Sequence, residues 1–244
     1  IVGGVYTITS AGDYKFICSN SQKTANRIVV DGDTISEQGN INIYLNNVNI
    51  NTSDGPALQI ADSVKAKVTI RLTGTNNLIT TKQQSAGLQK DNEAQLIITN
   101  ASDTTTGILK ASSDGSGYGA GIGSGNYGSC NNITIKSGSV TASSTSGAGI
   151  GGGLYGSCNN ITISGGSVNA QVGCTPHQNL DSSGSYDPKS PEVYLCVIPN
   201  TKTKSVAIDN KVWEPSNHKA VESTNTNLYA WLTGEDHLIT VEKE

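Results

Sequence analysis

The sequence predicts an all-β fold, a right-handed parallel β-helix of roughly five coils followed by a small C-terminal β subdomain. The main observation is an internal repeat: GAGIGSGNYGSCNNITIKSGSVTA at 119–142 recurs as GAGIGGGLYGSCNNITISGGSVNA at 147–170, a shift of 28 residues. The second is composition, with 28 Gly, 5% aromatic and 15% charged residues. Repetition at a fixed period is typical of a solenoid, and this composition is typical of short strands separated by turns.

Each repeat supplies three short strands. Apolar and polar residues alternate over 133–135 and over 140–142, but the step between these segments reverses the phase, so a corner is expected at 137–138. A third apolar stretch at 120–122 precedes them. Three strands joined by Gly, Ser and Asn turns form one coil. The right-handed crossover that parallel strands prefer gives the expected handedness.

Degenerate copies extend the pattern upstream. Segments similar to GAGIG and to NNITI occur as PALQI at 56–60 with VTIRL at 68–72, and as SAGLQ at 85–89 with QLIIT at 95–99. Aligning their alanines gives steps of 29, 34 and 28 residues between Ala57, Ala86, Ala120 and Ala148. INIYLNNVNI at 41–50 has the same phase-reversing corner. Such coils bury their apolar faces by stacking at about 4.8 Å on their neighbours.

The chain is expected to divide into four parts. Residues 1–40 form an N-terminal cap with the first strands, 41–173 the parallel β-helix repeats, 174–191 a polar linker and 192–244 the small β subdomain. A cap is expected because an open first coil exposes a strand edge. In the subdomain, apolar alternation predicts strands at 193–198, 205–208, 228–232 and 238–241.

Composition excludes some partners and favours export. The net charge is −4 and the only arginines are Arg27 and Arg71, so the electrostatic pattern of a nucleic-acid binder is missing. No apolar run approaches the ~20 residues that cross a bilayer, and without a signal peptide at its start the chain is expected to be a mature or trimmed fragment. A secreted or cell-surface location is expected from the polar composition and from sequons at Asn51, Asn100, Asn132 and Asn160.

The five cysteines are an odd number and contain no CxxC pair, which argues against a zinc site. The 28-residue shift makes Cys130 and Cys158 axial neighbours, at a separation compatible either with a disulfide or with a ladder of buried thiols. Cys174 and Cys196 can join the linker to the C-terminal subdomain.

The repeat resembles a known family at residues 119–170. The G-A-G-I-G-G/S-G and N/G-I-T-I-x-G-G-x-V-x-A units are similar to those of bacterial carbohydrate-binding-domain-containing surface proteins with parallel β-helices of the pectate-lyase-like type. LNNVNINTSDGPALQIADS at 45–63 and LYAWLTGEDHLITVEK at 228–243 are also similar to that family. The resemblance implies export, attachment to a cell envelope and polysaccharide binding. It also implies acidic sugars as ligands and calcium as a possible cofactor.

Catalysis is the chief competing function, because polysaccharide lyases and hydrolases share this fold. A lyase needs clustered acidic calcium ligands and a base, and a hydrolase needs paired carboxylates. The repeat at 119–170 contains no Asp or Glu. The carboxylates elsewhere have spacings typical of solvated turns; they are Asp31, Asp33, Asp91, Glu93 and Asp114. No enzymatic activity and no catalytic residue are therefore expected.

The best binding candidates are aromatic. Tyr127 and Tyr155 are equivalent in the repeat, with Tyr118 nearby, and exposed tyrosines suit sugar stacking. Arg71 is expected to point outward, where it can meet an acidic sugar or simply be solvated. A threonine array for ice binding is disfavoured because Ile97 interrupts the file of Thr69, Thr134 and Thr162. We therefore expect a non-enzymatic carbohydrate-binding or adhesive module, with a structural spacer and a calcium-dependent lyase as alternatives.

Overall fold

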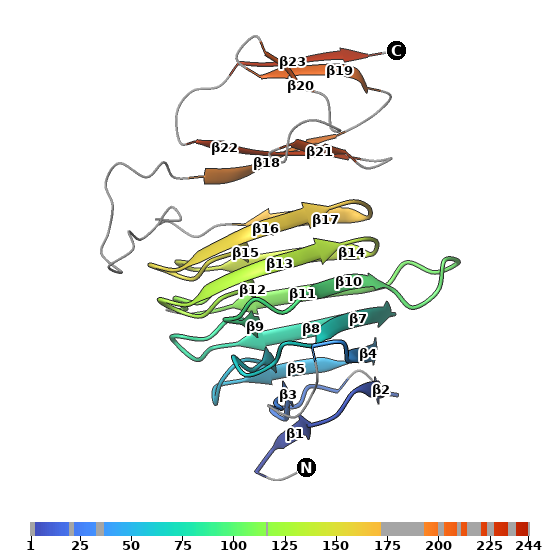
Figure 1. Cartoon of the computed structure of the whole chain (residues 1–244), viewed down its shortest axis with the longest axis vertical. Helices are drawn as coiled ribbons and strands as arrows, with labels where there is room; N and C mark the ends of the chain where they lie inside the picture. The colour runs from blue at the N-terminus through green and yellow to red at the C-terminus, as the bar shows by residue number, and fades with distance from the viewer. Residues whose placement is uncertain are drawn as a thin grey trace.

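The structure is a computed structural model of the 244-residue chain (Figure 1). It describes residues 3–19, 22–32, 37–115, 117–171, 193–199, 203–208, 211–213, 221–223, 227–233 and 238–243. All the regular structure in these ranges is β-strand. In this part of the chain, no helix is long and apolar enough to cross a membrane.

Three parallel sheets run along the first part of the chain. Sheet A contains β1 (Val5–Ile8), β3 (Arg27–Val30), β6 (Leu58–Ile60), β9 (Leu88–Lys90), β12 (Ile122–Gly123) and β15 (Ile150–Gly151). Sheet B contains β2 (Gly12–Ile17), β4 (Asn40–Asn46), β7 (Lys67–Thr73), β10 (Leu96–Asn100), β13 (Ser129–Ile135) and β16 (Ser157–Ile163). Sheet C contains β5 (Asn49–Thr52), β8 (Thr75–Thr80), β11 (Ile108–Ser113), β14 (Ser139–Ser144) and β17 (Ser167–Gln171).

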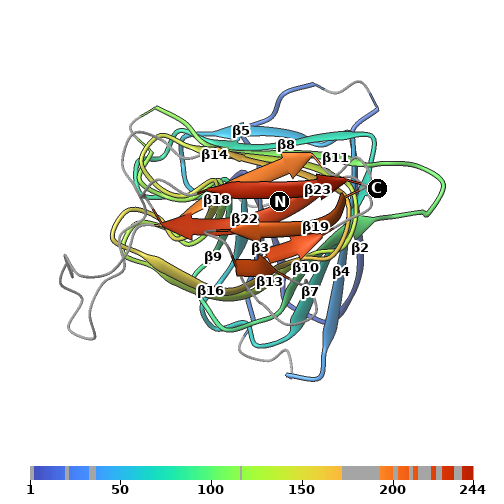
Figure 2. The same cartoon turned by 90° about the horizontal axis from the view of Figure 1, so that it is seen from above.

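Successive strands of the chain visit the three sheets in turn, which makes the fold a β-solenoid. Each of five coils contributes one strand to every sheet, from β3–β5 to β15–β17, and β1 with β2 forms an incomplete first coil. Figure 1 shows the coils stacked along the long axis, and Figure 2 shows the three sheets enclosing the interior. The predicted all-β parallel solenoid of about five coils is confirmed.

The interior is filled by files of equivalent aliphatic side chains. In sheet B, register pairing stacks one isoleucine per coil, each at most 1% exposed: Ile43, Ile70, Ile98, Ile135 and Ile163. The 28-residue equivalence of Ile133 and Ile161 is also confirmed. Burying one such side chain contributes roughly 1.5–3 kcal/mol, so the files supply most of the apolar stabilisation.

The corners lie where the phase of the apolar pattern reverses. β13 ends at Ile135 and β14 begins at Ser139, with Gly138 between them at a φ of 103°. The corner between β4 and β5 contains Asn47 at a φ of 55°, a backbone conformation that Asn tolerates better than most residues. The predicted corners at 137–138 and within 41–50 are therefore confirmed.

The predicted alignment of Ala57 with Ala86 is wrong by one residue. The strands pair Leu58 with Leu88, a step of 30 residues rather than 29. The segment that joins β8 to β9 (81–87) is two residues longer than the one that joins β5 to β6 (53–57), and the two buried leucines set the register after it. This register places Lys90 on the inward position that Ile60 occupies one coil earlier.

Two small antiparallel sheets follow in sequence. One contains β18 (Val193–Pro199), β21 (Val221–Ser223) and β22 (Asn227–Thr233), and the other contains β19 (Thr203–Ile208), β20 (Lys211–Trp213) and β23 (Ile239–Lys243). The four strands expected from apolar alternation are present. The sequence missed β20 and β21, which are three residues long and too short to show a period. The linker predicted at 174–191 lies outside the described residues.

Shortening the side chain of Ile98, in the middle of the isoleucine file, tests whether the stacked side chains stabilise the fold. We expect Ile98→Ala to lower the free energy of unfolding by about 2–5 kcal/mol, because Ile98 is fully buried between Ile70 and Ile135 and the cavity cannot collapse easily. Lys110→Ala, at an exposed position of β11, is the control and should change it by less than about 0.5 kcal/mol. Urea unfolding measures both, and equal midpoints for the two variants would contradict the packing described.

Candidate functional site

Two glycine-rich loops project between sheets A and B in the last two described coils. The first joins β12 to β13 and contains Gly125 to Gly128, and the second joins β15 to β16 and contains Gly153 to Gly156. Each closes a tight turn, in which the N–H of Gly128 donates to the carbonyl of Gly125 (3.1 Å) and that of Gly156 to Gly153 (2.8 Å). The loops stack because no side chain intervenes: a Cβ on Gly156 would lie 2.5 Å from the carbonyl oxygen of Gly128.

Each loop holds a tyrosine in the left-handed backbone region. Tyr127 has a φ of 58° and Tyr155 a φ of 56°. A bulky non-glycine residue in this region costs about 1–3 kcal/mol, and such residues concentrate at functional sites. Both copies of the repeat carry tyrosine at this position, where Gly or Asn would fold at lower cost.

The two rings stack on each other. Their centroids are 5.1 Å apart and their planes are inclined by 22°. Tyr127 is 63% exposed and Tyr155 is half-buried. Each ring shields one face of the other, so a ligand can reach only the remaining faces, the edges and the hydroxyl groups. The two tyrosines thus form a solvent-facing aromatic surface that extends along the solenoid axis.

The backbone of Tyr118 is hydrogen-bonded to the loop that carries Tyr155. Its N–H donates to the carbonyl of Gln83 (2.6 Å) and its own carbonyl accepts from the N–H of Leu154 (2.6 Å), the residue before Tyr155. The Tyr118 side chain is half-buried. Close by, the side-chain oxygen Oδ1 of Asn126 is buried and accepts no hydrogen bond from a described residue.

Asp91 supports the first loop from the coil below. Its Oδ1 accepts from the N–H of Gly125 (2.8 Å) and its Oδ2 from the side chain of Gln89 (2.6 Å). Burial raises the pKa of the Asp91 carboxyl, against the opposite effect of these two hydrogen bonds. The sequence suggested a solvated turn for this carboxylate, and that interpretation is wrong, because the larger loop of the following coil covers it.

Lys90 is fully buried, with an exposed fraction of 0%. Its ammonium donates to the backbone carbonyls of Asn92 (2.8 Å) and Asn131 (2.6 Å). Burial lowers the pKa of Lys90 from 10.5 to about 8, although Glu93 and Asp91 act in the opposite direction. No pattern in the sequence marks Lys90 as buried, since its inward direction depends on the register of a degenerate coil.

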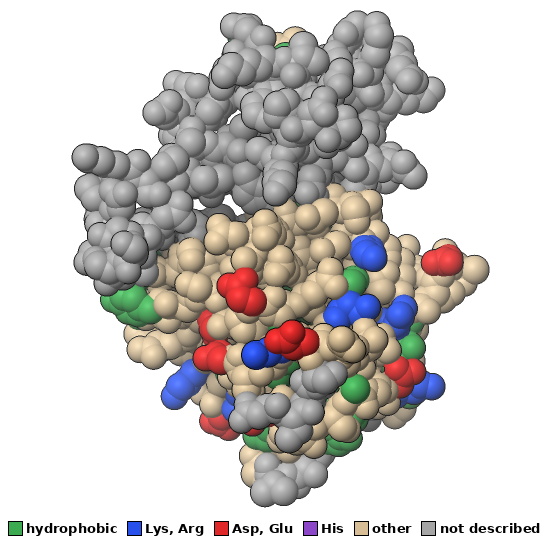
Figure 3. Space-filling model, in the orientation of Figure 1, with side chains coloured by type: hydrophobic (Ala, Val, Ile, Leu, Met, Phe, Trp, Pro, Cys, Tyr) green, Lys and Arg blue, Asp and Glu red, His purple; other side chains and the backbone are tan. Residues whose placement is uncertain are grey.

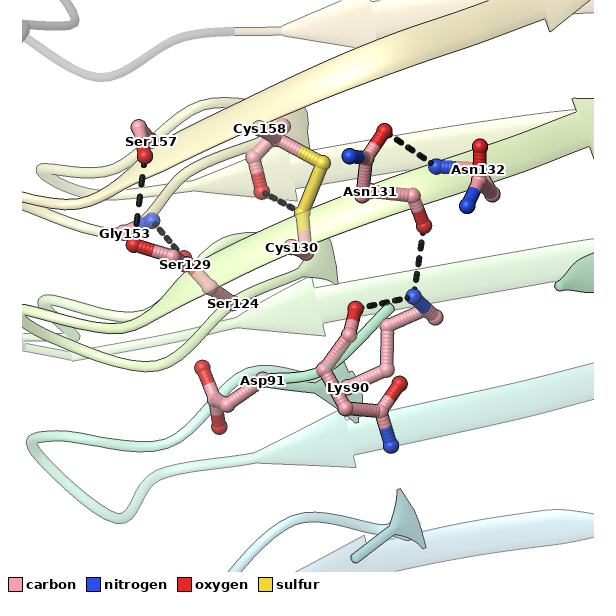
Figure 4. Close-up of a disulfide and its surroundings, with 12 residues drawn as sticks. Lys90, Asp91, Ser124, Ser129, Cys130, Asn131, Asn132, Gly153, Ser157 and Cys158 are labelled. Carbon is pink, nitrogen blue, oxygen red and sulfur yellow. Dashed lines mark hydrogen bonds between the residues drawn. A yellow bond between two sulfur atoms is a disulfide. The ribbon is translucent and has the colours of Figure 1, made fainter. Parts of the chain in front are cut away.

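A disulfide joins the coils directly above Lys90 (Figure 4). Cys130 and Cys158 are paired in register with a Cα–Cα distance of 4.4 Å, so the bridge is present rather than a thiol ladder. It ties the two tyrosine-bearing coils together within a few residues of both loops. Cys174 lies outside the described residues, so its pairing with Cys196 stays a prediction.

The remaining sequence candidates lie apart from the loops. Arg71 is on the outward side of sheet B, half-buried, and donates through Nε to Oδ1 of Asn42 (3.4 Å). Ile97 pairs with Thr69 on one side and with Thr134 on the other, so it does interrupt the threonine file. In the described ranges, no group of three or more His, Cys, Asp or Glu side chains is placed to hold a metal ion.

Comparison with known proteins bears on the solenoid. A family model described as a beta helix repeat matches residues 133–154 and 161–184. The chain is thus similar to beta helix repeat proteins over these residues. No curated protein and no solved structure matches the chain.

Replacing Lys90 tests its buried charge. Between pH 8 and pH 10.5 the unfolded chain, with the ordinary lysine pKa, binds more protons than the folded chain, so stability rises with pH across this window. The Lys90→Met variant fills a similar volume without a titrating group. We expect the unfolding free energy of the natural chain minus that of Lys90→Met to increase by roughly 3 kcal/mol from pH 7 to pH 10.5.

The measurement is urea unfolding of both proteins at several pH values without reductant, which keeps the disulfide intact. Lys65→Met, at an exposed position, serves as the control and should show no such pH-dependent difference. A difference between the natural chain and Lys90→Met that stays constant across this window would contradict the burial of the ammonium.

Proposed function

We propose that this protein is a non-enzymatic carbohydrate-binding module of a secreted or cell-surface protein, and that Tyr127 and Tyr155 contact the sugar. The observation that carries the proposal is the stacked pair itself. Two equivalent tyrosines are kept in an unfavourable backbone conformation, and the first of them is largely exposed. Tyrosine offers an apolar ring and a hydroxyl, which together suit a ligand with alternating C–H and O–H groups.

The surroundings of the tyrosines support a preformed site. The disulfide and the Asp91 hydrogen bond fix the two loops before any ligand arrives, which lowers the ordering entropy paid on binding. A disulfide between coils also favours an oxidising compartment, in agreement with export. The buried Lys90 and Asp91 have structural hydrogen-bond partners, which favours binding over catalysis for this part of the molecule.

A structural spacer is the second candidate. Stacked coils with a continuous aliphatic core and a covalent bridge between coils give a rod that needs no ligand, and the tyrosine pair then stabilises only the loops. A calcium-dependent lyase is the third candidate, carried by the resemblance of the repeat rather than by any carboxylate cluster in the described residues.

The proposal is tested with Tyr127→Asn combined with Tyr155→Asn. Asn tolerates the left-handed backbone, so the loops should keep their conformation. On an array of plant and bacterial polysaccharides, we expect the natural chain to be retained and the double variant to bind at least roughly 5-fold more weakly, since both aromatic contacts are lost. The control is Tyr127→Phe with Tyr155→Phe, which keeps the rings.

The array is run with and without calcium, and the supernatant is checked for unsaturated sugar products. Retention that survives the Asn substitutions would overturn the tyrosine site. If the natural chain binds no polysaccharide on the array, the result would favour the spacer. New unsaturated products that require calcium would favour the lyase.

A further inference from the structure

Tyr127 and Tyr155 are held against each other by the backbone of their loops. The N–H of Tyr127 donates to the carbonyl of Leu154 (3.0 Å), and the N–H of Ser157 donates to the carbonyl of Gly128 (3.1 Å). These two bonds join the loops on either side of the tyrosines. Because the loops form the same turn with nearly the same φ at the tyrosine, both side chains leave the backbone in the same direction. The rings are therefore in register for the same reason as the strands.

Equivalent atoms of the two rings lie close together. The centroids are 5.1 Å apart and the planes are inclined by only 22°. In rings stacked in this way, each Cε carbon, which is next to the carbon that bears the hydroxyl, lies about as far from its counterpart as the two centroids do. Tyr127 is 63% exposed, so its ring has room to turn on its Cβ–Cγ bond. Such a rotation brings a Cε carbon of each ring together.

The pair is open to a large reagent from the solvent. Figure 3 shows hydrophobic side chains exposed at the side of the molecule where the loops after β12 and β15 project. Tyr127 gives access from outside, and Tyr155 lies in direct ring contact behind it. An oxidant that meets the first ring therefore reaches the second by electron transfer through the stack.

The other aromatic contact of the described residues lacks this chemistry. Tyr6 meets Phe16 edge-on, with their ring centroids 5.1 Å apart. A phenylalanine ring has no hydroxyl that a one-electron oxidant can convert into a phenoxyl radical. Within the part of the chain that the structure describes, the contact between Tyr127 and Tyr155 is thus the aromatic contact in which two phenols meet.

We propose that Tyr127 and Tyr155 form an intramolecular dityrosine cross-link when a haem peroxidase oxidises the protein with hydrogen peroxide. Each phenol loses one electron and its hydroxyl proton, and the peroxide takes up both electrons and both protons to give two molecules of water. The two radicals join through a bond between one Cε carbon of each ring. Each of these carbons then releases its hydrogen as a proton while the ring oxygen takes up a proton, which restores both phenols.

The stacking favours coupling within one molecule over coupling between molecules. Two groups held in contact react as one unit, which is equivalent to a very high local concentration of one radical beside the other. The loops are fixed before oxidation by their backbone hydrogen bonds and by the nearby disulfide, so little ordering is needed. This reactivity goes beyond the sugar binding proposed above and does not depend on it.

The cross-link would repeat a connection that the disulfide already makes. The bridge between Cys130 and Cys158 joins the same two coils, close in sequence to both tyrosines. A covalent bridge stabilises a fold mainly by restricting the unfolded chain, so a second bridge between nearly the same points adds little while the first is intact. Thiol reductants cleave the disulfide but not a carbon–carbon bond. Dityrosine would therefore keep the two coils joined under reducing conditions.

The experiment treats the full chain with a haem peroxidase and hydrogen peroxide. We expect the blue fluorescence of dityrosine in a product that remains a monomer on denaturing electrophoresis. Mass spectrometry of its peptides should find those of Tyr127 and Tyr155 joined, with the loss of two hydrogen atoms. Tyr127→Phe and Tyr155→Phe, which keep the rings, should each lose the fluorescence of the monomer. Tyr6→Phe and Tyr118→Phe are the matched controls and should retain it.

Fluorescence of the monomer that persists in either Tyr127→Phe or Tyr155→Phe would refute the assignment, as would dityrosine found only in cross-linked dimers. Urea unfolding of the purified product gives a second measurement. Coupling should raise the unfolding midpoint with dithiothreitol present and leave it nearly unchanged without; equal midpoints for coupled and uncoupled protein under reduction would count against the cross-link. A natural chain that binds sugar but forms no dityrosine refutes this inference alone, whereas dityrosine without sugar binding refutes only the proposed function.

Discussion

Parallel pairing in register between successive coils is the interaction on which the rest of this structure depends. Each strand donates and accepts backbone hydrogen bonds on both sides, so no inner coil is satisfied without its neighbours. The same register places Ile70, Ile98 and Ile135 above one another inside and Arg71 above Tyr44 outside. Core and surface are therefore two consequences of one alignment.

Coil four shows what happens where the repeat length changes. Leu88 pairs with Ile122, and Leu96 pairs with Ile133. The chain therefore takes eight residues to pass from sheet A to sheet B in coil four, which contains β9 and β10. It takes eleven residues to make the same passage in the next coil. The longer loop covers Asp91, whose Oδ1 accepts from the N–H of Gly125. Lys90 points inward instead and donates to the carbonyls of Asn92 and of Asn131 in β13. Asp91 thus supports the first tyrosine loop from below, and Lys90 supports the strand that follows this loop.

The sequence was informative wherever the repeat is nearly identical. It predicted that Tyr127 and Tyr155 lie one coil apart in equivalent loops and that Cys130 and Cys158 are adjacent, because one shift of 28 residues determines both. It did not predict that Lys90 is buried, since its inward direction depends on register in a degenerate coil, where turn lengths vary. It also could not show that each tyrosine ring hides one face of the other, because ring orientation follows from loop conformation.

A solenoid surface repeats along its axis, and this limits the ligands that it can recognise. A small molecule would use one coil and gain nothing from the others, whereas a linear polymer meets equivalent groups again and again. Contacts that are individually weak then act together once the first is made, since the next group is already held nearby. Affinity therefore depends on the match between the period of the polymer and the period of the coils.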